Sequence, residues 1–189
     1  MPLDTNALFT ALAAVKLLVT DVDGVLTDGG VYYDDAGRET KRFHIHDGLG
    51  IVLAGFANLP VVWITGRTSP VVERRARELK VAYLAQGVRD KVVVLRDVAA
   101  RFGVTPREVA YIGDDLNDLP ALRFVGVALT PQNAATEVAQ AAHWTIPREG
   151  GQGVVRYAIE SILRARGDYD VALAAYLTSL GELASNPVQ

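Results

Sequence analysis

Residues 17–30, LLVTDVDGVLTDGG, decide the fold of this chain. The stretch opens as an apolar run typical of a strand that is covered on both faces, and it then carries Asp21, Asp23 and Asp28 close together. Carboxylates a few ångströms apart raise one another's pKa and repel unless a cation lies among them. The stretch therefore predicts a buried strand that ends in an acidic site, where the acids hold a metal ion or one of them reacts.

Short apolar runs alternate with helical patterns along most of the chain. This alternation is typical of strand–helix–strand units, which form a mainly parallel sheet. We therefore expect a Rossmann-like three-layer α/β/α fold around a central parallel sheet. The strands are expected at 15–22, 61–65, 81–85, 109–114, 125–129 and 143–146. The helices are expected at 48–58, 70–80, 90–103, 116–123, 132–142 and 152–166, with a further short helix near the N-terminus.

Residues 29–47 depart from this alternation. They read as two strands, VYY and KRFHI, joined by a turn at 34–37, so we expect a β-hairpin that projects over the acidic site. The length of 189 residues suits one domain over residues 1–189, with a core at about 15–167 and a tail at 168–189.

Composition narrows the class of protein. A formal net charge of -3 argues against nucleic acid or an acidic membrane surface as the partner. The chain has no cysteine, which excludes disulfides, zinc–thiolate sites and thiol nucleophiles. No apolar run is long enough to span a membrane, and the N-terminus lacks the basic lead of a secretory signal. We expect a cytoplasmic protein whose partner is a small molecule.

Polar side chains follow several of the expected strands, at the sheet edge where parallel α/β folds bind ligands. Asp21 and Asp23 follow the first strand, Thr65 follows the second, and GDDLND (113–118) follows the fourth. The loop before the helix expected at 90–103 offers Lys91. Carboxylates, a hydroxyl and a lysine together suit a phosphoryl group held with Mg²⁺, and an aspartate can itself attack phosphorus.

The motifs DVDGVLTD, ITGR, Lys91 and GDDLND, in this order, resemble the four motifs of the haloacid dehalogenase (HAD) superfamily of phosphohydrolases. The gaps between the motifs have no room for a cap domain of about 50 residues, so the chain resembles the capless (C0) type. The resemblance implies that Asp21 is the nucleophile and that Asp23 is the general acid and base. It implies Mg²⁺ binding by Asp21, Asp23 and Asp114 with the backbone carbonyl of Val22, and phosphate binding by Thr65, Gly66 and Lys91.

The segments GVLTDG, KRFHIHDGLG and GGQGVVR resemble capless phosphatases that act on phosphorylated sugar acids. This resemblance implies hydrolysis of 3-deoxy-D-manno-octulosonate 8-phosphate through an aspartyl-phosphate, with a nonulosonate 9-phosphate as the alternative substrate. It also implies a homotetramer whose hairpins join at the centre and whose sites are completed by neighbouring subunits. Asp47, Gly48 and Arg67 are expected to face the sugar acid, although Arg67 could instead pair with a helix acid such as Glu73.

Other side chains near these motifs have a structural alternative. Asp115 and Asp118 are expected to support the metal ligands or to order their loop. Lys91 could instead be a solvated residue at the start of a helix. Only the order of the motifs favours a functional role for Lys91 over this alternative. His44 and His46 alternate on the expected strand, but without a third ligand a structural or subunit-contact role is favoured over a metal site.

A non-catalytic oligomerisation or regulatory module is the alternative from another functional class. Such a module would be expected to have lost the nucleophile or the general acid. Asp21 and Asp23 are both present, which favours the enzyme.

Overall fold

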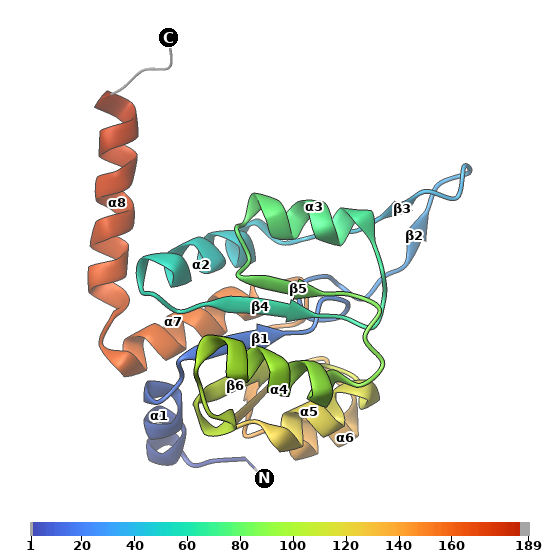
Figure 1. Ribbon diagram of the computed structural model, residues 1–189, viewed down its shortest axis with the longest axis horizontal. Helices are drawn as coiled ribbons and strands as arrows, with labels where there is room; N and C mark the ends of the chain where they lie inside the picture. Colours follow the sequence, from blue (N-terminus) through green and yellow to red (C-terminus); the bar gives the residue numbers. More distant parts are fainter. Residues whose placement is uncertain (1, 186–189) are drawn as a thin grey trace.

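The computed structural model describes residues 2–185. Its centre is a sheet of six parallel strands in the order β5-β4-β1-β6-β7-β8, with helices on both faces (Figure 1). The three-layer α/β/α fold expected from the sequence is confirmed. The strands are β1 (Leu17–Thr20), β4 (Val61–Ile64), β5 (Tyr83–Ala85), β6 (Val109–Ile112), β7 (Val127–Pro131) and β8 (Trp144–Ile146).

Two apolar clusters hold the helices against the sheet. Side chains alternate between the faces of a strand, so Leu18 of β1 enters the cluster with α2, α3 and α7, whereas Leu17 and Val19 enter the cluster with α4, α5 and α6. The helices are α1 (Thr5–Ala13), α2 (Ile45–Phe56), α3 (Pro70–Glu78), α4 (Lys91–Phe102), α5 (Leu119–Phe124), α6 (Thr136–Ala141), α7 (Val154–Arg166) and α8 (Tyr169–Ser185). Two 3₁₀ turns, η1 (Pro106–Glu108) and η2 (Leu116–Asp118), precede β6 and α5.

The hairpin is shorter than the sequence suggests. β2 (Tyr32–Tyr33) pairs with β3 (Glu39–Thr40), and the chain then turns into α2. KRFHI is therefore wrong as a strand: His44 is the residue that caps α2, and its Nδ1 accepts a hydrogen bond from the backbone N–H of His46 at 3.3 Å. The capping bond competes with strand extension, because Nδ1 satisfies one of the free N–H groups of the first helical turn.

Two elements project from the body of the molecule (Figure 1). The hairpin β2–β3 extends beyond the carboxyl ends of the strands, and α8 extends from the opposite end. The first part of α8 packs on α2, where the rings of Phe56 and Tyr176 lie 5.9 Å apart. Residues 186–189 of the expected tail lie outside the described residues. Among residues 2–185, no helix combines the length and the apolar character needed to cross a bilayer.

Candidate functional site

The acidic site lies where three neighbouring strands end. In the order β4-β1-β6, the loops after these strands lie side by side and place Thr65, Asp21 and Asp114 at one edge of the sheet. A cavity of about 230 Å³ opens there. It is lined by Asp21, Asp23, Gly29, Thr65, Gly66, Arg67, Asp114, Asp115 and Asn117.

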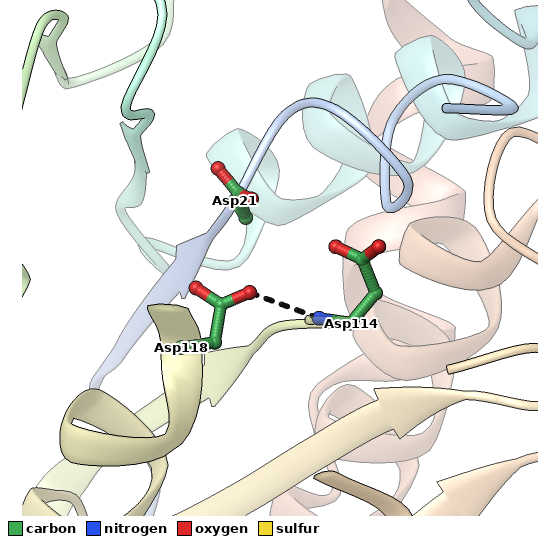
Figure 2. A group of neighbouring side chains, drawn as sticks. All are labelled: Asp21, Asp114 and Asp118. Atoms are coloured by element: carbon green, nitrogen blue, oxygen red, sulfur yellow. Dashed lines mark hydrogen bonds between the residues drawn. The ribbon is translucent and has the colours of Figure 1, made fainter. Parts of the chain in front are cut away.

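Three carboxyl groups converge beside this cavity (Figure 2). Asp21, Asp114 and Asp118 each offer an oxygen, and these atoms lie within 4.8 Å of one another. The oxygens of Asp118 already have partners: Oδ1 accepts from Lys91 Nζ and from Tyr111 O–H, each at 2.6 Å, and Oδ2 accepts from the backbone N–H of Asp114 at 3.0 Å. Asp118 therefore orders the loop and the lysine, and it leaves Asp21 and Asp114 as the acids with free oxygens.

Asp21 and Asp114 are suited to a cation. Within the part of the chain that the structure describes, Oδ1 of each is buried without a hydrogen-bond partner. Burial, and then the charge of Asp118, raise the pKa of Asp21 to about 7. Burial, and then the charges of Asp21 and Asp118, raise the pKa of Asp114 to about 8. A divalent cation between the two carboxylates would remove this repulsion and give the free oxygens a ligand, so the residues fit Mg²⁺.

Lys91 is held inside the site rather than in solvent. Its ammonium lies 3.2 Å from Asp21 Oδ2 and 2.6 Å from Asp118 Oδ1, and its side chain is 2% exposed. Burial alone would lower the pKa of Lys91, but Asp21 and Asp118 raise it above its usual value, so the ammonium stays charged. The Asp90 carboxylate caps α4 through the N–H groups of Val92 and Val93, which starts the helix at Lys91.

The turn after β1 is built around Gly24. Its φ of +89° is in the left-handed region, and a Cβ there would collide with the Asp114 carboxylate. The carbonyl of Val22 accepts hydrogen bonds from the N–H groups of Leu26 at 2.9 Å and Thr27 at 3.1 Å. The Val22 carbonyl therefore closes the turn, and its expected contact with the metal stays a prediction.

The Asp23 carboxylate lies apart from the three converging acids. One oxygen pairs with Lys41, whose side chain is 2% exposed, and the other lies 3.5 Å from Thr65 Oγ1. The group of acids that could hold a metal includes Asp118 rather than Asp23. Asp23 lines the cavity beside Thr65, and its expected role as a metal ligand stays a prediction.

Lys41 and Glu39, which the hairpin brings over the site, were not predicted from the sequence. Glu39 Oε1 lies 3.4 Å from Lys41 Nζ and 2.8 Å from Arg67 Nη2. The two residues are separated by one position, and this spacing in an extended segment puts both side chains on one side. The sequence does carry a signal that could have identified them: a Glu-x-Lys pattern in a hairpin that is expected to cover the site.

Asp47 and Gly48 are not among the residues that line the cavity, and their contact with the sugar acid stays a prediction. The Asp47 side chain is buried, and its Oδ1 accepts from the backbone N–H of Arg156 at 2.8 Å, in the first turn of α7. Burial raises the pKa of Asp47. At Gly48 a Cβ would collide with the guanidinium of Arg75. Both residues act in helix packing. The Asp47 carboxylate accepts a hydrogen bond from a free N–H group at the start of α7, and the absence of a side chain at Gly48 makes room for Arg75.

Arg67 and Asp115 both line the cavity. Arg67 does not pair with Glu73, because Glu73 binds Arg77 at 2.8 Å. Arg67 instead contacts Glu39 and, at 3.3 Å, the hydroxyl of Tyr33. Asp115 caps η2, where its carboxylate accepts from the N–H of Leu116 at 2.8 Å.

A second hollow of about 540 Å³ is larger but carries no comparable chemistry. It lies between α2 and α8 and is lined mainly by apolar side chains such as Ile51, Phe56 and Leu180. Converging carboxylates and a buried lysine make the smaller cavity the candidate active site.

Comparison with known proteins adds independent findings. The family model of the haloacid dehalogenase-like hydrolases matches residues 57–157. The 3-deoxy-D-manno-octulosonate 8-phosphate phosphatase KdsC of Salmonella typhi is 36% identical over 171 residues, which cover 90% of each chain.

Solved structures agree with the sequence comparison. A HAD superfamily (subfamily III A) hydrolase from Legionella pneumophila superposes with a TM-score of 0.90 at 37% identity, over 92% of this chain and 95% of the other. The 3-deoxy-D-manno-octulosonate 8-phosphate phosphatase of Moraxella catarrhalis, in complex with a magnesium ion, a phosphate ion and a KDO molecule, superposes with a TM-score of 0.87 at 35% identity. That match covers 91% of this chain and 99% of the other.

Proposed function

The chain belongs to the haloacid dehalogenase-like hydrolases, and from this premise we propose that it is a Mg²⁺-dependent phosphatase of a phosphorylated sugar acid. Its substrate is 3-deoxy-D-manno-octulosonate 8-phosphate, which it hydrolyses to 3-deoxy-D-manno-octulosonate and inorganic phosphate. The observation that carries the chemistry is the meeting of Asp21 and Asp114 at one cavity, with Lys91 Nζ 3.2 Å from Asp21 Oδ2.

Asp21 and Asp114 would hold the Mg²⁺ ion through their free carboxylate oxygens. When bound, the ion supplies positive charge to the phosphoryl oxygens and offsets the repulsion between the acids. Asp118 holds Lys91 and the loop of Asp114 in place through its hydrogen bonds. Lys91 and the hydroxyl of Thr65 then bind the phosphoryl oxygens, with Gly66 allowing the backbone to approach.

In the first chemical step, a carboxylate oxygen of Asp21 attacks phosphorus and the bond from phosphorus to the sugar oxygen breaks. Asp23 donates a proton to the departing oxygen, so the sugar acid leaves as an alcohol. The product on the enzyme is an aspartyl-phosphate on Asp21. Lys91, 3.2 Å from Asp21 Oδ2, favours the ionised form of the nucleophile and holds it in position before attack.

In the second step, Asp23 takes a proton from water, and the water oxygen attacks phosphorus. The bond between phosphorus and Asp21 breaks, which releases inorganic phosphate and restores both carboxyl groups. The position of Asp23 at the cavity mouth, beside Thr65 and Lys41, supports this exchange of protons.

A substrate panel tests the function. With Mg²⁺, we expect phosphate release from 3-deoxy-D-manno-octulosonate 8-phosphate with a kcat/KM at least about tenfold above that for an acylneuraminate 9-phosphate or a hexose 6-phosphate. EDTA should abolish release, and added Mg²⁺ should restore it. Preference for the nine-carbon acid would move the assignment to the alternative substrate. Full turnover in metal-free buffer would contradict the metal site of Asp21 and Asp114.

The assembly is a homotetramer in this proposal, with hairpins joined at its centre and each site completed by neighbouring subunits. Val31, Tyr32 and Tyr33 of the hairpin are 54%, 46% and 62% exposed. A two-stranded hairpin with exposed aromatic side chains gains stability when it pairs with other strands. The protein is expected to work in the cytoplasm, in keeping with the lack of cysteine.

Replacing Tyr32 and Tyr33 together by serine tests the assembly. We expect the mass from light scattering to fall from a tetramer to a smaller species, and kcat/KM to fall with it, because the apolar contact between hairpins is lost. Val93→Ser, which changes an exposed apolar residue on α4, is the matched control and should leave both unchanged. A wild-type chain that is monomeric at working concentration would rule out this arrangement.

A further inference from the structure

Glu39 joins the hairpin to the mouth of the active site. Its Oε1 accepts from Arg67 Nη2 at 2.8 Å and lies 3.4 Å from Lys41 Nζ. Its Oε2 accepts from the hydroxyl of Ser69, the residue that precedes α3. Tyr33 adds a contact from its hydroxyl to Arg67 at 3.3 Å. The side chain of Glu39 is only 14% exposed, although it belongs to a projecting hairpin (Figure 1).

Through these contacts Glu39 pairs with two cations, of which Arg67 lines the substrate cavity. Arg67 lines the cavity, and Lys41 also contacts Asp23. The third cation, Lys91, is already bound by Asp21 and Asp118. An anionic substrate that approaches the mouth of the cavity therefore meets cations that are already paired with carboxylates of the protein.

We propose that Glu39 is a specificity-determining residue that stands in for the carboxylate of the sugar acid at Arg67 and is displaced by it. The inference rests on the proposed function, because only a substrate with a carboxylate can replace Glu39 with a group of the same chemistry. A phosphate monoester without a carboxylate leaves Glu39 on Arg67 and gains nothing from that arginine.

The charge of Glu39 and the exposure of Arg67 support displacement of Glu39 by the substrate over a purely structural role for Glu39. Burial would raise the pKa of Glu39, but its bonds from Ser69 and Arg67 lower it, so the residue is a full anion like the substrate group. The Arg67 guanidinium is 43% exposed, so an incoming carboxylate can reach it from solvent. An arginine binds carboxylates in a planar, bidentate manner, and one carboxylate excludes another.

Glu39→Gln tests the proposal, because it removes the charge, keeps the size and leaves one acceptor oxygen in place of two. A competing internal group reduces the apparent affinity by the fraction of time that it occupies the site. For a partly exposed pair we expect KM for 3-deoxy-D-manno-octulosonate 8-phosphate to fall about threefold to fivefold in the variant. KM for p-nitrophenyl phosphate, which has no carboxylate, should change by less than about twofold.

A second readout needs no turnover of the sugar phosphate. The free sugar acid, 3-deoxy-D-manno-octulosonate, should inhibit p-nitrophenyl phosphate hydrolysis more strongly in Glu39→Gln than in wild type, by the same factor as the fall in KM. Arg67→Gln in the Glu39→Gln background should remove this gain. Asp34→Asn is the matched control, since Asp34 is a hairpin acid that pairs with Arg38 at 2.6 Å and lies outside the cavity.

The outcomes separate this inference from the proposed function. A parallel rise in KM for both esters would show that Glu39 only braces the hairpin, and unchanged constants would show that it does not compete; either result overturns the inference. If wild type fails to prefer the sugar acid phosphate, the substrate assignment fails, yet inhibition by the free sugar acid still tests Glu39. Thermal unfolding of Glu39→Gln confirms that the comparison uses folded protein.

Discussion

Asp21→Asn is expected to abolish phosphate release while the fold stays intact. An amide cannot form the aspartyl-phosphate, so kcat/KM should fall by about 10⁴-fold or more. The substitution also removes one of the buried acids whose pKa the site raises, so the metal-free protein should unfold at an equal or higher temperature than wild type.

The measurement is single-turnover and steady-state phosphate release with Mg²⁺, together with thermal unfolding. Asp97→Asn on α4 is the matched control: it makes the same chemical change at an exposed position and should keep full activity. Near-normal turnover by Asp21→Asn would eliminate the covalent mechanism, whereas an unfolded variant would point to a structural role for Asp21.

Asp114→Asn is expected to change activity and metal-free stability in opposite directions. Loss of a metal ligand should lower kcat/KM by about 10³-fold or more, because a bound ion supplies several kcal/mol to a phosphoryl transition state. In the metal-free protein the pKa of Asp114 is raised from 3.8 to about 8. The folded state thus holds a proton that the unfolded state releases, so wild-type stability should fall as pH rises from about 4 to about 8 and level off above that.

Thermal unfolding in EDTA at pH 5 and pH 8 tests the predicted direction of this change in stability. We expect Asp114→Asn to unfold at a higher temperature than wild type at pH 8, with a smaller difference at pH 5, where the wild-type carboxyl group is protonated. Mg²⁺ should stabilise wild type at pH 8 and have little effect on the variant. Asp115→Asn is the control from the same cavity, because asparagine also caps η2, and it should keep the response to Mg²⁺. Equal responses in Asp114→Asn and wild type would place the metal elsewhere.

Local signals predicted most of the architecture correctly. The apolar runs located each strand of the central sheet, and the helix expected at 90–103 is α4. The sequence failed at KRFHI, where a period of two in side-chain polarity favoured a strand. His44 caps α2 instead, because a side-chain acceptor next to a helical segment ends the extended backbone.

The candidate site was likewise predictable only in part from the sequence. The order of the motifs predicted that Asp21, Thr65, Lys91 and Asp114 would meet, and the structure brings them to one edge of the sheet. The local sequence gave no sign that Asp47 satisfies the start of α7, since its partner Arg156 is distant in the chain.

By itself, the sequence determined the fold class, the family and the candidate reactive acids, because each follows from neighbours along the chain or from a motif. Only the tertiary structure decided which charges meet across the fold: Glu39 with Arg67, Lys41 with Asp23, and Asp118 with Lys91. The reason is physical. Hydrophobic periodicity specifies which face of an element is buried, whereas an ion pair depends on where two separate segments come to rest against each other.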